Sequence, residues 1–286
     1  MTGVADVLHY AAFTDSPAGG NPAGVVLDAS ELDDDAMQAI ATEVGYSETA
    51  FVRRANDDPR AFDVRYFAPS AEVAFCGHAT IATGVALAER FGPGRYVLNT
   101  KVGAVPVEVV DSGGWFRATL TSTPPNLKEL PDDALDALLR TLRWQRADLH
   151  PLFPPKVAYA GVWHPVIAVS DRTRLADLDY DFEALRALML DNEWTTVQLA
   201  WRESPAVFHV RDPFPVGGVV EDPATGAAAA AFGHYLRELG LIEPPSTITL
   251  HQGDDLGRPS VLMVDVDSDD PRIRVSGRAV AIKNGT

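Results

Sequence analysis

Short apolar runs that alternate with polar positions predict strands along most of the chain, and longer periodic runs predict a few helices. In the first half we expect strands over residues 9–13, 23–27, 47–52, 61–67, 96–99 and 104–110, and helices over 32–44 (capped by Ser30) and 78–91. The second of these helices is apolar on nearly every side until Glu89. A helix of that kind is buried all round rather than laid on a surface.

The second half of the chain repeats this order of elements. We expect strands over residues 157–159, 165–169, 207–210, 248–251 and 259–264, and helices over 178–189 and 227–239. Three matches share one spacing of 146 residues: Val64-Arg65 with Val210-Arg211, Pro69 with Pro215, and Cys76 with Asp222. A repeat of that length predicts two similar domains, divided near the prolines of residues 123–126.

The segment Cys76-Gly77-His78 reads as a strand that turns directly into a helix. Its counterpart in the repeat carries Asp222 and Thr225. If the two corners face each other, two helix N-termini converge on one crevice, which favours a small carboxylate-bearing substrate. In the alternative interpretation these residues have structural roles only: Cys76 is a small buried hydrophobic residue, and His78 and Asp222 are helix caps.

Glu48 begins a strand with apolar residues on both faces, so its carboxylate is expected to be partly desolvated, as a proton shuttle requires. The alternative is a solvent-facing glutamate at a strand end. Trp163 and His164 lie in a segment that can line a pocket, although both are also compatible with core or surface positions.

Composition and charge exclude several classes of protein. The chain of 286 residues has a formal net charge of −16, which argues against a nucleic-acid partner. One cysteine makes no internal disulfide, which fits a reducing cytoplasm. No signal peptide is apparent and no apolar run reaches the ~18 residues of a membrane span. We therefore expect a cytoplasmic protein without a membrane partner.

Signatures of other chemistries are missing from the sequence. It contains no G-x-S-x-G, H-E-x-x-H, Walker or G-x-G-x-x-G motif. Cys76 and His78 lack clustered further ligands in the sequence, so no zinc site is expected. The residues thus give no reason to expect a metal or an organic cofactor.

Five motifs in order along nearly the whole chain resemble the PhzF family of phenazine-biosynthesis-like isomerases. They are Gly20-Asn21-Pro22, residues 47–52 (SETAFV), residues 75–80 (FCGHAT), residues 220–226 (VEDPATG), and Gln252-Gly253 with residues 257–260 (GRPS). The resemblance implies an α+β fold like that of diaminopimelate epimerase, with two similar tandem domains, each a barrel-like, mostly antiparallel sheet around a central helix. It places residues 1–122 plus 275–286 in one domain and residues 123–274 in the other. It also implies no metal or organic cofactor, and commonly a homodimer.

The resemblance also assigns roles residue by residue. Glu48 matches the general acid/base, His78 a histidine that orients the substrate, and Asp222 a carboxylate of the second domain. Cys76 and Asp222 occupy the places of the two catalytic cysteines of related epimerases. The residues expected to bind substrate are Asn21, Cys76, Gly77, Thr225, Gly226 and Ala227. Ala227 departs from the family, because members that act in phenazine synthesis carry a serine there.

Together these features predict a cofactor-independent isomerase that moves a proton on a small carboxylated metabolite in an interdomain cleft, with Glu48 as acid/base. A second hypothesis makes Cys76 and Asp222 the two bases of an epimerase or racemase. A third keeps the scaffold but makes it a non-catalytic metabolite-binding protein.

Overall fold

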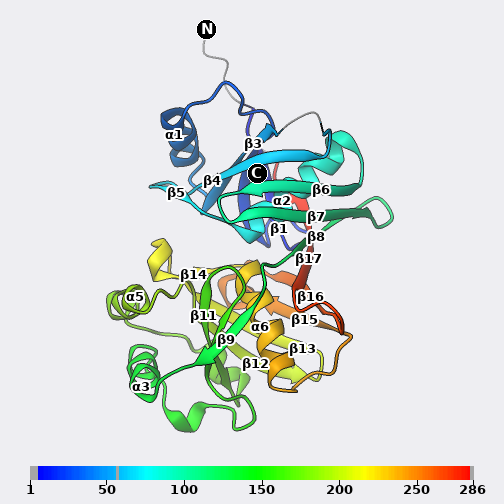
Figure 1. Cartoon of the computed structure of the whole chain (residues 1–286). Helices are drawn as coiled ribbons and strands as arrows, with labels where there is room; N and C mark the ends of the chain where they lie inside the picture. The colour runs from blue at the N-terminus through cyan, green and yellow to red at the C-terminus, as the bar shows by residue number, and fades with distance from the viewer. Residues whose placement is uncertain (1–5, 56–57, 284–286) are drawn as a thin grey trace. The chain divides into compact units, whose positions relative to one another are not determined.

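The chain forms two compact units, each with strands arranged around a central helix (Figure 1). The computed structural model describes residues 6–55 and 58–283. Residues 1–121 and 276–286 make the first unit, and residues 122–275 make the second.

The first unit is a closed barrel. Its elements are β1 (Leu8–Ala12), β2 (Asn21–Val26), α1 (Asp34–Val44), β3 (Glu48–Arg54), β4 (Ala61–Phe67), β5 (Glu72–Val73), α2 (Gly77–Phe91), β6 (Gly94–Thr100), β7 (Gly103–Asp111) and β8 (Phe116–Thr121). Among the described residues, eight strands form a ring in the order β1-β2-β3-β4-β6-β7-β8-β17, which closes because β17 (Ile273–Ala281) pairs with both β8 and β1. The pairs β2–β3 and β4–β6 are parallel.

Helix α2 lies inside this barrel and is buried from Gly77 to Ala88. Its small residues let the strands come close. A Cβ added at Gly84 would lie 2.8 Å from Val107 Cγ1 and 3.3 Å from Ala118 Cβ. The predicted all-round burial of this helix is therefore confirmed, and it follows from its small and apolar residues and from the absence of Asp, Glu, Lys and Arg before Glu89.

The second unit wraps its sheet around α6 (Gly226–Glu238). Its other elements are β9 (Asn126–Glu129), α3 (Asp132–Thr141), η1 (Arg146–Asp148), β10 (Lys156–Tyr159), β11 (Trp163–Val169), α4 (Arg172–Ala176), α5 (Phe182–Asp191), β12 (Gln198–Ser204), β13 (Val207–Pro213), η2 (Pro215–Gly217), β14 (Glu221–Asp222), β15 (Ser246–Gln252), η3 (Asp254–Leu256) and β16 (Ser260–Val266). The strands run β9-β10-β11-β12-β13-β15-β16, with β11–β12 and β13–β15 parallel.

Two neighbouring groups of apolar side chains complete the second unit. Helix α6 is buried over most of its length, and a Cβ added at Gly233 would lie 2.7 Å from Val264 Cγ1. Helices α3 and α5 pack together through residues such as Leu138 and Met189, against apolar residues of the sheet. With the barrel of the first unit, this arrangement confirms the predicted α+β class.

Several predicted boundaries were wrong, each for a local reason. Helix α1 begins at Asp34 and is capped by Asp33, whose Oδ1 accepts from Ala36 N at 2.8 Å. Ser30, the predicted cap, instead donates to Asp28 Oδ1. The helix expected at 178 begins at Phe182, after the cap Asp181. The apolar pattern did not predict strands β8, β9 and β12 or helices α3 and α4.

The repeat between the two units is real, but its spacing is not constant. Strands β4 and β13 have the same length and lie 146 residues apart at both ends. The helices that follow begin at Gly77 and Gly226, which are 149 apart. The change of spacing arises because residues 68–71 of the first unit correspond to the longer segment 214–220, which contains η2.

This longer segment changes which residues correspond at the two corners. Cys76 and Thr225 are the N-caps of the two central helices, so Thr225 is the counterpart of Cys76. Asp222 pairs with Asp212 across β13–β14 as Val73 pairs with Tyr66 across β4–β5. The predicted pairing of Cys76 with Asp222 within the repeat was therefore wrong by three residues.

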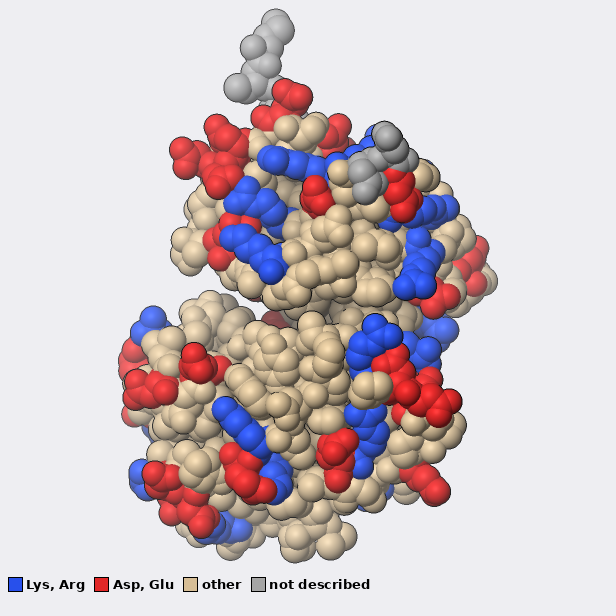
Figure 2. Space-filling view, viewed as in Figure 1, with Lys and Arg blue, Asp and Glu red and all other residues tan. Residues whose placement is uncertain are grey.

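Charges of both signs are interspersed over the face of each unit shown in Figure 2, with apolar and uncharged surface between them. The acidic excess of the sequence is thus spread out rather than gathered into one field on that face. Among the helices described, none combines the length and the apolar character that a membrane crossing requires.

Candidate active site

Glu48 is a buried carboxylate at the first position of β3. The strand runs parallel to β2, and Ala23 is the Cα partner of Glu48. The four residues that follow, Thr49 to Val52, are all buried, and the Glu48 residue at the start of the strand is 9% exposed. The structure therefore rules out the solvent-facing alternative for Glu48.

The corner between β5 and α2 holds Cys76 and His78. Cys76 is the N-cap of α2, with extended backbone and without a side-chain cap bond, and Thr80 Oγ1 donates to its carbonyl at 2.6 Å. His78 is the second residue of the helix and is 4% exposed. His78 is therefore not a helix cap.

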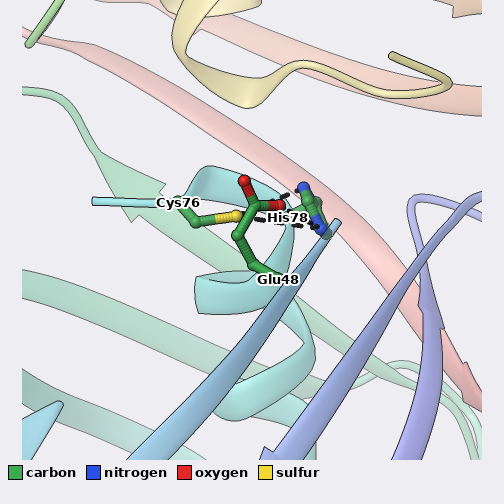
Figure 3. A group of neighbouring side chains, drawn as sticks. All are labelled: Glu48, Cys76 and His78. Atoms are coloured by element: carbon green, nitrogen blue, oxygen red, sulfur yellow. Dashed lines mark hydrogen bonds and ion pairs between the residues drawn. The ribbon is translucent and has the colours of Figure 1, made fainter. Parts of the chain in front are cut away.

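These three side chains meet at one point of the first unit (Figure 3). Glu48 Oε2 lies 3.4 Å from His78 Nε2. Cys76 Sγ lies 3.3 Å from His78 Nδ1 and 3.7 Å from Nε2. Glu48 lies at the start of a strand, and Cys76 and His78 lie at the start of a helix at least 28 residues later in the chain. The barrel brings these side chains together.

Two further polar side chains position the imidazole. Asn21 Nδ2 lies 3.0 Å from His78 Nδ1, and Ser47 Oγ lies 3.3 Å from Nε2. Asn21 was predicted as a site residue, and the structure shows that it contacts the histidine. Ser47 was missed, although it stands directly before Glu48 in the SETAFV motif.

Burial lowers the pKa of His78 below its usual value, while the Glu48 carboxylate and the backbone of Pro22 act in the opposite direction. The net direction is downward, so the imidazole is neutral at pH 7. A neutral ring beside a carboxylate can orient it by hydrogen bonding.

The same three residues have the ligand types of a site for a soft divalent cation. Their ligand atoms, one from each side chain, all lie within 4.8 Å of one another. Thiolate, imidazole and carboxylate are the ligands that zinc takes in proteins. No further ligand lies near Cys76 and His78 in the sequence, but β3 brings Glu48 next to them from a distant part of the chain.

The corresponding corner of the second unit is built around Asp222, which is 6% exposed. Thr225 Oγ1 donates to Asp222 Oδ2 at 2.6 Å. Gln252 binds both ends of this turn, since its amide oxygen accepts from Thr225 N at 2.9 Å and its amide nitrogen donates to the Asp222 carbonyl at 2.8 Å. Gly226 and Ala227 then open helix α6.

Asp222 precedes the cap position of α6 by three residues, so it too is more than a helix cap. Gln252 was missed as a site residue, although the motif Gln252-Gly253 carried the signal. Glycine is required at 253, because φ is +77° and an added Cβ would lie 2.3 Å from the Arg258 carbonyl.

A match to the family model described as "Phenazine biosynthesis-like protein" covers residues 10–285. The chain belongs to this PhzC-PhzF family. The family explains why the five motifs occur in order, and the resemblance inferred from them is confirmed.

Curated members of the PhzC-PhzF family are similar over their whole length. An uncharacterized isomerase of Bacillus subtilis, YfhB, is 30% identical over 99% of this chain and 97% of its own. A trans-2,3-dihydro-3-hydroxyanthranilate isomerase of Pseudomonas chlororaphis is 31% identical over 97% of this chain and 98% of its own. The chain is thus a PhzF-family isomerase.

Solved structures agree with the fold of the PhzC-PhzF family. A predicted epimerase of Pseudomonas aeruginosa is 29% identical and superposes with a TM-score of 0.85 over 97% of this chain and 96% of that one. A probable proline racemase of Agrobacterium radiobacter is 13% identical, with a TM-score of 0.67 over 96% of this chain and 90% of that one. The second likeness concerns the fold alone.

Proposed function

We propose that this protein is a cofactor-independent isomerase that moves a proton on a small carboxylated metabolite, with Glu48 as the general acid/base. The observation that carries the proposal is the position of Glu48, which is 9% exposed and has its Oε2 3.4 Å from His78 Nε2. A desolvated carboxylate held by a neutral imidazole suits proton transfer to and from carbon.

In the proposed reaction Glu48 takes a proton from one carbon of the substrate and becomes a carboxylic acid. It then delivers a proton to another carbon, so the enzyme ends in its starting form. Exchange of the Glu48 carboxyl proton with solvent between the two steps puts deuterium into the product. His78, held by Asn21 and Ser47, keeps the carboxyl group in place during both steps. No external reductant or oxidant is needed for this exchange.

Substrate binding is proposed to use the N-terminal turns of both central helices, next to Gly77 and to Thr225-Gly226. Backbone N–H groups and the helix dipole favour a carboxylate at such positions. In the proposed binding mode Asp222 would bind polar groups of the substrate. Asp222 is suited to this role because Thr225 and Gln252 fix its turn.

The proposal is tested by hydrogen exchange from deuterated water, followed by NMR. The compounds are hydroxylated, unsaturated and amino carboxylic acids, beginning with trans-2,3-dihydro-3-hydroxyanthranilate, which the name of the Pseudomonas chlororaphis relative gives as that enzyme's substrate. Glu48→Gln should slow exchange by about 100-fold or more. Glu108→Gln is the matched control, since Glu108 is an exposed residue of β7 in the same unit.

A two-base epimerase that uses Cys76 and Asp222 is the second candidate. The contact between Cys76 Sγ and His78 Nδ1, at 3.3 Å, favours it because an imidazole beside a thiol promotes the thiolate. Cys76→Ser would then lower exchange by about 100-fold or more. A serine variant with full exchange would dismiss this mechanism and leave Glu48 as the base.

The third hypothesis, a non-catalytic protein on the same scaffold, has no observation in its favour, and the relatives named as isomerases count against it. It would bind a carboxylic acid without incorporating deuterium into it. Solvent exchange into any compound of the screen, lost in Glu48→Gln, contradicts this candidate.

A further inference from the structure

The side chains of Glu48, Cys76 and His78 converge from two elements, the start of β3 and the start of α2 (Figure 3). One ring nitrogen, Nε2 of His78, lies 3.4 Å from Glu48 Oε2 and 3.7 Å from Cys76 Sγ. A carboxylate oxygen of Glu48 and the sulfur also lie within 4.8 Å of each other. All three residues are buried in the first unit.

These distances match the spacing of ligand atoms around a tetrahedral metal ion. Zinc binds imidazole nitrogen and carboxylate oxygen at about 2.0–2.2 Å and thiolate sulfur at about 2.3 Å, so neighbouring ligand atoms are about 3.3–3.7 Å apart. The two distances from Nε2 fall in this range. The third is at most about 1 Å longer, and a change in the side-chain torsions of Glu48 can close that difference.

The charge of the three ligands also favours a divalent cation. A thiolate and a carboxylate carry two negative charges, and burial makes each of them costly without a counter-ion. Among the described residues, no lysine or arginine side chain forms a salt bridge with Glu48. A divalent ion neutralises both charges, and the Cys76 thiol gives up its proton to solvent when the ion binds.

The imidazole is oriented by partners outside the ligand set. Asn21 Nδ2 lies 3.0 Å from His78 Nδ1, and the backbone of Pro22 also hydrogen-bonds the ring. A metal-bound histidine almost always has its second ring nitrogen hydrogen-bonded, which fixes the orientation of the ring. His78 thus has the kind of support that a metal-binding histidine requires.

The second unit does not repeat this set of ligands. Thr225 and Ala227 stand at the cap and the second helical position of α6, where the first unit has its thiol and its imidazole. Counting along the paired strands puts Thr196 where the first unit has its glutamate. Within the part of the chain that the structure describes, the group in the first unit is the one cluster of three such ligands.

We propose that Glu48, Cys76 and His78 bind a Zn²⁺ ion, and that this ion inhibits the isomerase. Once its oxygen coordinates the ion, the Glu48 carboxylate cannot take a proton from carbon, so zinc is an inhibitor of this site and not a cofactor. The thiolate selects zinc over Mg²⁺ and Ca²⁺, which prefer oxygen ligands. The inhibition rests on the proposed function, in which Glu48 is the base; the binding of the ion does not.

Cobalt(II) is the probe of the site, because it accepts the same ligands as zinc and absorbs light. Thiolate coordination gives Co²⁺ a charge-transfer band in the near ultraviolet. The full-length protein should bind one Co²⁺ per chain with this band, and added Zn²⁺ should remove the band by displacing the cobalt. Added Mg²⁺ should leave it unchanged. A wild-type protein that shows no thiolate band with Co²⁺ would overturn the proposal.

Substitutions assign the ligands. Cys76→Ser should abolish the band, and Glu48→Gln and His78→Gln should each weaken Co²⁺ binding by about 100-fold or more, since losing even a partner of a metal ligand costs about 10- to 100-fold. The two glutamine variants change different elements, so one remains informative if the other does not fold. Equal affinity in wild type and in either folded glutamine variant would overturn the proposed ligand set.

His209→Gln is the matched control in the second unit. His209 Nε2 lies 2.8 Å from Glu203 Oε2, so this pair offers an imidazole and a carboxylate, but the one cysteine of the chain is Cys76. The variant should bind Co²⁺ as the wild type does. Loss of binding in His209→Gln would assign the ion to that pair and would overturn the proposal.

Deuterium exchange tests the inhibition. Saturating Zn²⁺ should stop exchange in the wild type, and EDTA should restore it; exchange at the metal-free rate in the zinc-loaded protein would overturn the inhibition. A failure of the proposed function is recognised separately. If Glu48 is not the base, metal-free Glu48→Gln exchanges at the wild-type rate although it has lost Co²⁺ binding. If the metal site is wrong, the Co²⁺ titrations fail and the exchange results are unaffected.

Discussion

At the scale of single residues, the site depends on a glutamate that sequence patterns place but do not connect. Its position at the start of a buried strand was readable from the run SETAFV. The contact of Glu48 with His78 could not be predicted from the sequence. It depends on the parallel pairing of β2 with β3 and on helix α2, which begins at Gly77, 29 residues after Glu48. Local patterns carry no information about such long-range register.

We expect Ala227 to affect substrate choice most directly. It is a half-buried residue of the first turn of α6, where family members acting in phenazine synthesis carry a serine. Ala227→Ser adds a hydroxyl donor there, so we expect faster exchange into trans-2,3-dihydro-3-hydroxyanthranilate, by about 5- to 10-fold for one added hydrogen bond. The measurement is the initial exchange rate by NMR.

Ala227→Cys is the control for that change, because it adds a group of similar size with a weak donor. Equal rates in the serine and cysteine variants would show that the hydroxyl does not bind this substrate.

At the scale of elements, the two central helices were the most predictable part of the fold and the corners beside them the least. A helix that is apolar on nearly every side is stable where it is buried all round, and both central helices are buried over most of their length. The three-residue difference between segments 68–71 and 214–220 leaves no trace in the apolar pattern. It shifted the predicted counterpart of Cys76 from Thr225 to Asp222.

The close approach of strands to these helices predicts that Gly84→Ala destabilises the protein. The new methyl would lie 2.8 Å from Val107 Cγ1, which is too near for a stiff β-branched side chain to yield freely. Overpacking costs about 1–3 kcal/mol and the gain in helix propensity returns about 1 kcal/mol, so we expect a net loss of up to about 2 kcal/mol. Urea unfolding measures it.

Gly233→Ala is the matched change in the second unit, where the methyl would lie 2.7 Å from Val264 Cγ1. It should destabilise to a similar degree. A gain in stability in either variant would mean that the sheet relaxes around the helix and that its glycines are not needed for packing.

At the scale of the whole molecule, buried histidines make the fold sensitive to acid. Burial lowers the pKa of His164 to about 3, with the backbone of Thr196 acting weakly against it, and burial also lowers the pKa of His78. At a pH below about 6.5 but above the pKa values of the folded protein, these histidines take up protons in the unfolded chain and stay neutral in the folded protein. Stability is therefore present above pH 6.5 and is lost as the pH falls.

His164→Gln should flatten this acid limb. For each such histidine the free energy of unfolding falls by about 1.4 kcal/mol per pH unit below 6.5, until the folded group titrates. Urea unfolding of wild type and variant at pH 7, 6, 5 and 4 gives the two slopes. Identical slopes would show that His164 is protonated in the folded state.

The duplicated architecture of the molecule was predictable because one order of strands and helices occurs twice. The difference between the side chains at corresponding places of the two units was not predictable from that order. Glu48, Cys76 and His78 meet in the first unit, whereas Thr196, Thr225 and Ala227 take the corresponding places in the second.

The central claim is that Glu48 moves a proton on carbon, and deuterium incorporation tests it most directly. Wild type and Glu108→Gln should incorporate deuterium from solvent into the true substrate at equal rates, and Glu48→Gln should do so about 100-fold more slowly or not at all. Exchange at the wild-type rate in a folded Glu48→Gln protein would contradict the account.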